Sequence, residues 1–165
     1  MNIILIGMSG VGKTYLGKYV SEKLNMPFYD TDELIINKYN TQLKDLIKIH
    51  SWEWFRNEEY LTLQKLNEMK NIIISTGGGI IENVNIKELF DSHLIIYIKR
   101  NVNNEIKLER CLSKSYDELY KDREPIYEKL SKNIFNNDSE PAIFLKYIIP
   151  FISLPSSTEV KYSVL

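Results

Sequence analysis

The stretch GMSGVGKT at residues 7–14 decides the fold, because it fits the phosphate-binding pattern G-x-x-x-x-G-K-[ST]. The apolar run Ile3–Ile6 before it predicts a buried strand, and the apolar spacing of Lys13–Leu24 after it predicts a helix. In such a loop the glycines let backbone N–H groups point at phosphate oxygens, with the positive end of the helix behind them. Lys13 would reach the β- and γ-phosphates, and the Thr14 hydroxyl would bind Mg²⁺. A glycine-rich turn that binds nothing is the alternative, and the strand–loop–helix order argues against it.

Short β-branched runs alternate with helical stretches along the rest of the chain. Further strands are expected at 27–30, 71–75, 93–98 and 132–135. Helices are expected over 32–69 with breaks near 40–41 and 50–51, and over 83–90, 102–112, 117–132 and 139–149, the last stopped by Pro150. Apolar strands separated by helices predict a three-layer α/β/α fold, a five-stranded parallel sheet with helices on both faces. Ligands of such sheets bind beyond the carboxyl ends of the strands.

The composition is that of one globular domain: 165 residues, 44% hydrophobic and 26% charged, with a formal net charge of −1. No block of like charges indicates nucleic acid or an anionic membrane, and the apolar runs are too short to cross a bilayer. The first residues carry no basic segment and no small-residue cleavage site, so we expect no secretory signal. The single Cys111 cannot form an internal disulfide, which fits a reducing compartment. We therefore expect a cytoplasmic protein, although composition alone names no activity.

Two acidic residues, Asp30 and Asp32, end the second expected strand. In extended backbone, residues two apart project to the same side, so both side chains would face the phosphate loop. Such a pair offers one carboxylate to the hydration shell of a metal and another to accept the proton of an attacking hydroxyl. The alternative for Asp32 is a cap at the start of the next helix.

Two further motifs indicate a site for a small anionic acceptor. Arg56 and Glu59 are three residues apart on one face of an expected helix, and a guanidinium held by a carboxylate is suited to clamping a substrate carboxylate. An exposed ion pair is the alternative for these two residues. Gly77–Gly79 ends the third expected strand, and three adjacent glycines suggest that a ligand or another backbone approaches closely.

Five motifs in this order resemble the shikimate kinase family over about residues 2–150. Besides the phosphate loop, the family's D-T-D is at 30–32, its F-R-x-x-E at 55–59, its S-x-G-G-G at 75–79 and its R-x-P-x-Y at 123–127. The resemblance implies a P-loop fold like that of nucleoside monophosphate kinases. It also implies transfer of the ATP γ-phosphate to the 3-hydroxyl of shikimate, in the biosynthesis of chorismate and the aromatic amino acids.

The same resemblance assigns roles on the acceptor side. Asp32 would hydrogen-bond the shikimate hydroxyls and act as the base, so that Lys13 and Asp32 are the expected catalytic residues. Arg56 and Arg123 would clamp the shikimate carboxylate. The backbone of Gly77, Gly78 and Gly79 would pack against its ring.

On the nucleotide side, the resemblance implies ATP as co-substrate and Mg²⁺ as cofactor. Asp30 and Ser75 would contact Mg²⁺ through water, and Thr14 would ligate it directly. Arg110 would stack on the adenine. The expected ATP-binding residues are Gly10, Val11, Gly12, Lys13, Thr14, Tyr15 and Arg110. We expect a monomer whose partners are these small molecules, with neither nucleic acid nor membrane among them.

The chain departs from the family in its lid. The family's R-P-L-L motif is absent, and the lid is cut to about residues 111–116, where Lys114 could supply charge. Asn40 stands where the family usually has Gly, a mild change because Asn tolerates positive φ. We expect a kinase domain over residues 1–153 and a tail, 154–165, without an assigned role. Two alternatives stay open: a kinase for another polyol such as gluconate, and a shikimate-kinase-like protein with weak or no catalysis.

Overall fold

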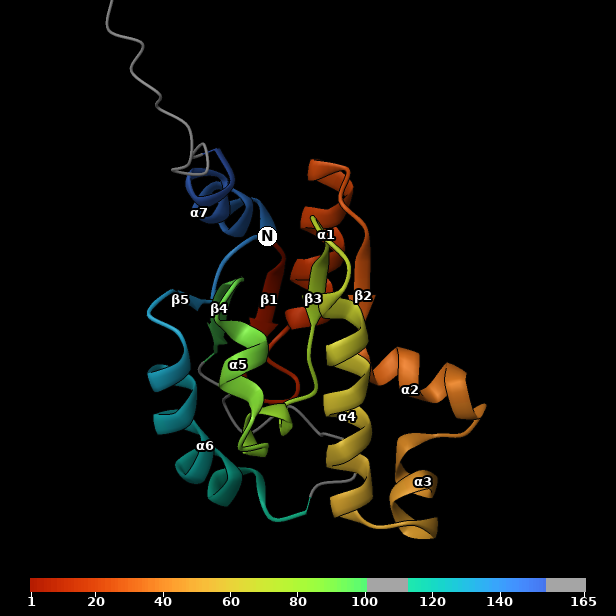
Figure 1. Cartoon of the computed structure of the whole chain (residues 1–165). Coiled ribbons are helices and arrows are strands. Elements are labelled where there is room, and N and C mark those ends of the chain that lie inside the picture. The colour runs from red at the N-terminus through yellow and green to blue at the C-terminus, as the bar shows by residue number, and fades with distance from the viewer. Residues whose placement is uncertain (101–112, 154–165) are drawn as a thin grey trace, which may run out of the picture.

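A sheet of five parallel strands forms the centre of the fold in the computed structural model, which describes residues 1–100 and 113–153 (Figure 1). The strands are β1 Ile3–Ile6, β2 Phe28–Asp30, β3 Ile73–Ser75, β4 Leu94–Lys99 and β5 Ile134–Asn136. Their order is β2-β3-β1-β4-β5, and every neighbouring pair is parallel. In the centre, Ile4 lies opposite Ile74 of β3 and Ile95 of β4. The parallel sheet expected from the apolar runs is confirmed.

Helices cover both faces of this sheet (Figure 1). They are α1 Lys13–Leu24, α2 Thr31–Tyr39, α3 Leu43–Ile49, α4 Trp52–Asn67, the 3₁₀ helix η1 Ile80–Glu82, α5 Ile86–Phe90, α6 Tyr116–Leu130 and α7 Pro141–Ser153. In Figure 1, α4 and α5 lie in front of the sheet, and α1 packs with α7 on the other face. No helix of the described segments is long and apolar enough to cross a membrane.

The two expected breaks between residues 32 and 69 are confirmed, and each has a local cause. Asn40 ends α2 in the left-handed conformation, with φ 48°, which Asn adopts at low cost. Ser51 begins α4, where its hydroxyl accepts a hydrogen bond from the Trp54 N–H. Asn in place of the family's usual Gly is therefore compatible with the turn.

The expectation that Pro150 ends the last helix is wrong, because α7 continues to Ser153. Proline has no N–H to donate to the carbonyl four residues earlier, so this hydrogen bond is lost, and the ring crowds that carbonyl. Tertiary packing offsets that loss: Phe144 and Ile148 are buried, and the Phe151 ring packs 5.7 Å from the Tyr147 ring. The helix expected over 83–90 is also shorter, because residues 83–85 form a turn between η1 and α5. The expected helix 102–112 and the tail 154–165 lie outside the described residues.

Two hydrophobic clusters position the functional loops. The larger one surrounds β1, whose residues Ile4, Leu5 and Ile6 are fully buried, and it anchors the phosphate loop that follows. The smaller one joins α2, α3 and α4 through Ile35, Leu46, Ile47 and Phe55. The helices α2 and α4, which carry part of this second cluster, lie beside the carboxyl ends of β2 and β3 (Figure 1).

Candidate active site

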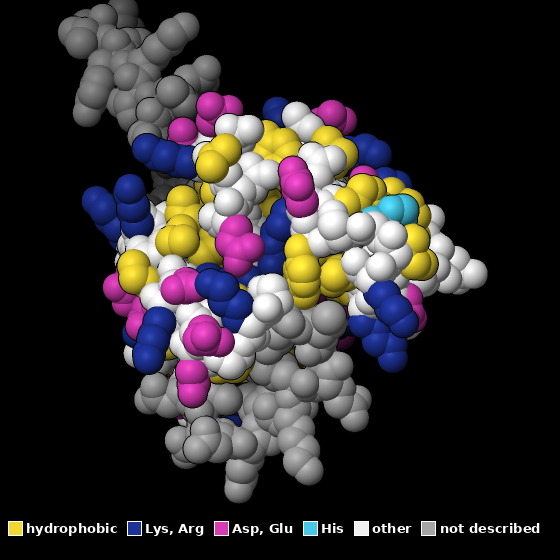
Figure 2. All heavy atoms as spheres, turned by 90° about the horizontal axis from the view of Figure 1, so that it is seen from below, with side chains coloured by type: hydrophobic (Ala, Val, Ile, Leu, Met, Phe, Trp, Pro, Cys, Tyr) yellow, Lys and Arg dark blue, Asp and Glu magenta, His cyan; other side chains and the backbone are white. Residues whose placement is uncertain are grey.

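The carboxyl ends of the strands face a cavity of about 410 Å³. Its lining includes the expected residues Thr14, Asp30, Asp32, Arg56, Gly77, Gly78, Gly79 and Arg123. Viewed from this end, basic and acidic side chains are interspersed over the described surface (Figure 2). The structure thus brings together the phosphate loop and the acceptor motifs, which are separated by up to about two thirds of the chain.

The phosphate loop is held in shape by glycine conformations and by its own lysine. Gly7, Gly10 and Gly12 all have positive φ, at 145°, 84° and 97°. Lys13 is buried, at 6% exposed, and its Nζ donates to the carbonyl oxygens of Gly7 and Met8, each at 2.8 Å. The ammonium therefore lies within the loop whose N–H groups would surround phosphate oxygens.

A residue from the far end of the chain supports the same loop. The Asn137 Nδ2 donates to the Val11 carbonyl at 2.7 Å, and the Asn137 N–H donates to the Lys99 carbonyl, also at 2.7 Å. A Cβ on Gly12 would lie 2.5 Å from that Nδ2, so a larger side chain there would displace Asn137. Sequence reasoning gave Asn137 no role, and its place just after β5 is the signal that could have found it.

Three oxygen-bearing side chains meet where Mg²⁺ is expected. The Thr14 Oγ1 donates to the Asp30 Oδ2 at 2.6 Å and lies 3.4 Å from the Ser75 Oγ. Hydroxyl and carboxylate oxygens are the hard ligands that Mg²⁺ prefers, and it commonly takes only one or two carboxylates alongside substrate phosphates. The described residues contain no cluster of three or more His, Cys, Asp or Glu side chains that could hold a metal without such help. The donor set fits a magnesium ion that is bound together with a nucleotide.

The Asp30–Asp32 pair differs from its expected geometry. The expectation of extended backbone for both is wrong, because α2 begins at Thr31 and places Asp32 in the first helical turn. The cap is Asp30, whose Oδ1 accepts from the N–H groups of Asp32 at 3.0 Å and Glu33 at 3.3 Å. The capping alternative for Asp32 is therefore wrong, and its carboxylate lines the cavity.

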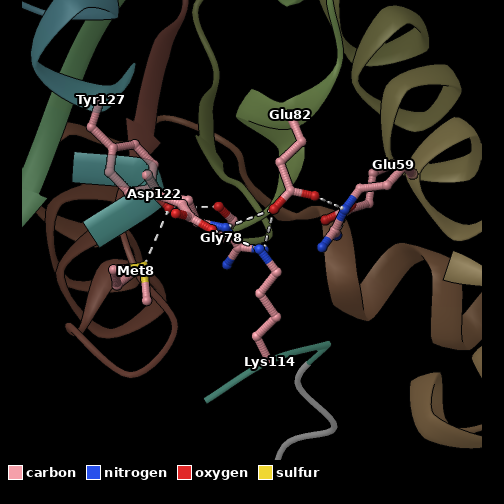
Figure 3. Close-up of polar contacts among 9 residues, drawn as sticks. Met8, Glu59, Gly78, Glu82, Lys114, Asp122 and Tyr127 are labelled. Atoms are coloured by element: carbon pink, nitrogen blue, oxygen red, sulfur yellow. Dashed lines mark hydrogen bonds and ion pairs between the residues drawn. The ribbon is translucent and has the colours of Figure 1, made fainter. Parts of the chain in front are cut away.

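Arg56 and Arg123 converge on one carboxylate, that of Glu82, which is labelled in Figure 3. The Arg56 Nε donates to the Glu82 Oε2 at 2.8 Å. The Arg123 Nε and Nη2 both donate to the Glu82 Oε1, at 2.8 and 2.6 Å. Burial acts to raise the pKa of the Glu82 carboxyl, but the two guanidiniums outweigh it and hold that pKa below its ordinary value. Two arginines from α4 and α6, both lining this cavity, thus bind one carboxylate of η1.

Each glycine of the triple motif has a different close neighbour. A Cβ on Gly77 would collide with the carboxylate of Glu59 and lie 2.8 Å from the Asp32 Oδ1. A Cβ on Gly79 would collide with the Arg56 guanidinium. Gly78 lies against the phosphate loop, with its Cβ position 3.2 Å from the Ser9 backbone nitrogen. The expectation of a close approach is confirmed, and the neighbours are charged side chains as well as backbone.

Glu59 is the most perturbed carboxyl of the site. It is 1% exposed, and its Oε2 accepts from the Arg56 Nη1 at 2.5 Å. Burial raises the pKa of Glu59 to about 7, against the lowering effect of Arg56, and the nearby Asp32 carboxylate adds to the rise. This carboxyl therefore changes charge near neutral pH, beside the arginine of the proposed clamp.

A family model described as shikimate kinase matches residues 9–153. The chain belongs to the shikimate kinase family. It is 34% identical to a shikimate kinase of Macrococcus caseolyticus, covering 92% of this chain and 96% of the relative. It is 36% identical to one of Clostridium botulinum strain Okra, covering 86% and 91%. The crystal structure of shikimate kinase from Aquifex aeolicus superposes with a TM-score of 0.77 at 30% identity, covering 92% of this chain and 96% of that one.

Several shikimate kinase motif positions fall outside the cavity or outside the described residues. Tyr15, an expected ATP contact, is 63% exposed on α1. Arg110, expected to stack on adenine, lies outside the described residues, as do the first two positions of the expected lid, 111–116. Of the described lid positions, Ser113 lines the cavity, and the Lys114 Nζ pairs with the Asp122 Oδ2 at 2.8 Å on the surface.

The tyrosine that closes the shikimate kinase motif R-x-P-x-Y connects α6 to the triple glycine. The Tyr127 hydroxyl donates to the Gly78 carbonyl at 2.5 Å, and its ring stacks 4.9 Å from Tyr97. Tyr127 is fully buried, so the Gly78 carbonyl would lose its partner if the hydroxyl were removed. The R-x-P-x-Y motif includes Tyr127, but the sequence alone assigns this residue no role.

Tyr127→Phe is expected to lower the free energy of unfolding by about 1–2 kcal/mol, because a buried carbonyl is left without its hydrogen bond. Urea unfolding followed by circular dichroism measures this change. Tyr15→Phe is the matched control, since its exposed hydroxyl makes no comparable buried contact. Equal stability of Tyr127→Phe and the parent would contradict the anchoring role.

The raised pKa of Glu59 predicts a pH dependence of stability. The folded state keeps the proton between pH 4.5 and about 7, where the unfolded carboxyl has lost it. The free energy of unfolding should therefore fall as pH rises through this range, by about 1–3 kcal/mol, and level off above pH 7. Glu59→Gln should lose this slope, and Glu53→Gln, exposed on the same helix, should keep it. Urea unfolding at pH 5, 6, 7 and 8 tests this, and an identical slope in Glu59→Gln would contradict it.

Proposed function

We propose that this chain transfers the γ-phosphate of ATP to the 3-hydroxyl of shikimate. Membership in the shikimate kinase family fixes the reaction class. The choice of shikimate as the acceptor rests on one observation, the convergence of Arg56 and Arg123 on a carboxylate. Both arginines line the same cavity as Asp32, next to the phosphate loop. A small acceptor with a carboxylate at one end and a hydroxyl at the other suits this arrangement.

The geometry suggests how the chain's own residues would perform the transfer. Lys13 and the loop N–H groups would hold the β- and γ-phosphates, and the arginine clamp would fix the acceptor's carboxylate. Asp32 would accept the proton of the attacking hydroxyl. A bound magnesium ion would neutralise charge on the phosphate oxygens, held by Thr14 directly and by Asp30 and Ser75 through water. Arg110 would cover the adenine.

We propose that residues 1–153 form the kinase domain and that the protein acts as a cytoplasmic monomer. The family model reaches Ser153, which supports that boundary. Size-exclusion chromatography with light scattering, with and without ATP and shikimate, measures the oligomeric state, and a dimer would contradict the monomer.

ADP release in a coupled assay, with and without shikimate, tests the proposed function directly. We expect release that depends on shikimate and on Mg²⁺. Faster release with gluconate than with shikimate would assign a different acceptor. Calorimetric binding of both ATP and shikimate without measurable release would instead identify a member of the family that lacks catalysis.

Arg56→Ala and Arg123→Ala should each raise the KM for shikimate by about tenfold or more, because each removes charged hydrogen bonds to the acceptor. Arg100→Ala, an exposed arginine at the end of β4, is the control and should leave this KM near the parent value. Initial rates at saturating ATP and varied shikimate concentration give the KM of each variant. If the two clamp variants bind shikimate like the parent, the acceptor assignment is wrong.

A further inference from the structure

Glu82 occupies N–H groups of the two arginines that would clamp a substrate carboxylate. Its two oxygens accept three hydrogen bonds from the clamp, one from Arg56 and two from Arg123 (Figure 3). A guanidinium pair presents a limited number of N–H groups to an anion in this position. An incoming carboxylate must therefore take over some of the contacts that Glu82 makes.

The negative charge of Glu82 also disfavours the binding of a carboxylated substrate. Arg56 pairs with both Glu59 and Glu82, and Arg123 pairs with Glu82. Two guanidiniums thus face two carboxylates of the chain before any acceptor enters. A carboxylated acceptor adds a further negative charge at close range, which disfavours its binding while Glu82 stays in place.

Of Glu59 and Glu82, Glu82 is the one whose side chain can move away from the arginines. Its side chain is 36% exposed, whereas that of Glu59 is enclosed between α4 and the triple glycine. Glu82 is the last residue of the short helix η1 and also lines a second cavity, of about 650 Å³, on the α5–α6 side. Lys87 and Lys129 line that cavity as well, so a displaced carboxylate would remain near positive charge.

We propose that Glu82 is a specificity-determining residue that competes with the acceptor's carboxylate for the Arg56–Arg123 clamp. Binding then requires exchange of one carboxylate for another. Only an acceptor that also satisfies Asp32 and the triple glycine gains enough contacts to displace Glu82, and simple anions do not. This inference rests on the proposed function, because it takes the clamp as the acceptor's carboxylate site.

The test compares Glu82→Gln, which keeps the side-chain shape and removes the charge, with the parent. The KM for shikimate should fall about fivefold, because the competing charge is gone. The decrease is modest because Glu82 is partly exposed, and a partly exposed ion pair is weaker than a buried one. The effect should fall on KM rather than on kcat. Glu88→Gln, an exposed glutamate on α5, is the matched control. Glu82→Ala removes the same charge and should shift KM in the same direction, which keeps the test valid if one variant fails to fold.

A neutral ligand separates competition from positioning. The methyl ester of shikimate lacks the negative charge, so its calorimetric affinity should be the same for the parent and Glu82→Gln. A KM for shikimate that rises or stays unchanged in both Glu82 variants would overturn the inference, because Glu82 would then hold the arginines in place or do nothing. Equal tightening for the ester would overturn it too. If the parent neither binds nor phosphorylates shikimate, the proposed function itself fails, which is a distinct result.

Discussion

Lys13→Met is expected to lower kcat for shikimate-dependent ADP release by about 10²–10³-fold or more, one of the two largest effects that we expect from a single substitution. Phosphoryl transfer depends on positioning and on charge stabilisation, and removing one preorganised donor at a developing charge costs about this factor. Lys13 is buried with its ammonium inside the phosphate loop, so no solvent cation can take its place at equal distance. The coupled assay at saturating ATP and shikimate measures the loss.

The control for Lys13 must separate lost chemistry from lost folding. Lys23→Met changes the same residue type in the last turn of the same helix, where the side chain is exposed, and should keep the parent rate. Because Lys13 also donates to the Gly7 and Met8 carbonyls, its removal could loosen the loop, so urea unfolding of both variants belongs in the experiment. A folded Lys13→Met protein with at least a tenth of the parent kcat would contradict the assigned role.

The parts of the fold that the sequence predicts well have local causes. The phosphate loop follows from eight adjacent residues, and the breaks at Asn40 and Ser51 follow from the backbone and side-chain preferences of those residues. The parallel sheet follows from apolar runs that lack alternation, because strands covered on both faces have no polar side. Such features need no knowledge of distant neighbours.

The features that sequence reasoning missed depend on contacts between distant segments. Glu82 meets Arg56 across 26 residues and Arg123 across 41, and Asn137 reaches Val11 across 126. Nothing near Glu82 in the sequence distinguishes it from an exposed glutamate. The continuation of α7 past Pro150 likewise depends on the core that packs against it.

The D-T-D motif does not by itself decide which role Asp30 takes and which role Asp32 takes. Both positions suit a helix cap, and only the start of α2 at Thr31 decides that Asp30 takes it. The Thr31 hydroxyl accepts from the Gly77 N–H at 3.0 Å, which fixes the helix start against the triple glycine. That contact links residues 46 positions apart, so the roles of the two aspartates could not be separated from the sequence alone.

Because Asp30 and Asp32 have separate roles, a substitution of Asp32 alone is expected to give the second large effect on kcat. Asp32→Asn should lower kcat by about 10²–10⁴-fold, because the amide keeps the shape of the side chain but cannot accept the proton of the attacking hydroxyl. Since Asp30 carries the helix cap and the contact with Thr14, the substitution should leave the phosphate loop and the affinity for ATP near their parent values. The KM for shikimate should change far less than kcat, because the amide still hydrogen-bonds hydroxyl groups.

A comparison of Asp32→Asn with Lys13→Met distinguishes the acceptor side of the site from the nucleotide side. Calorimetry should show ATP binding close to the parent for Asp32→Asn and weakened binding for Lys13→Met, although both lose turnover. Asp138→Asn, an exposed aspartate after β5, is the matched control for the chemical change and should retain the parent kcat. A kcat within a few-fold of the parent for Asp32→Asn would mean that the acceptor hydroxyl loses its proton elsewhere. Because Asp30 is engaged by the helix cap and by Thr14, whereas Asp32 lines the same cavity without capping the helix, the base would then have to be sought outside the D-T-D motif.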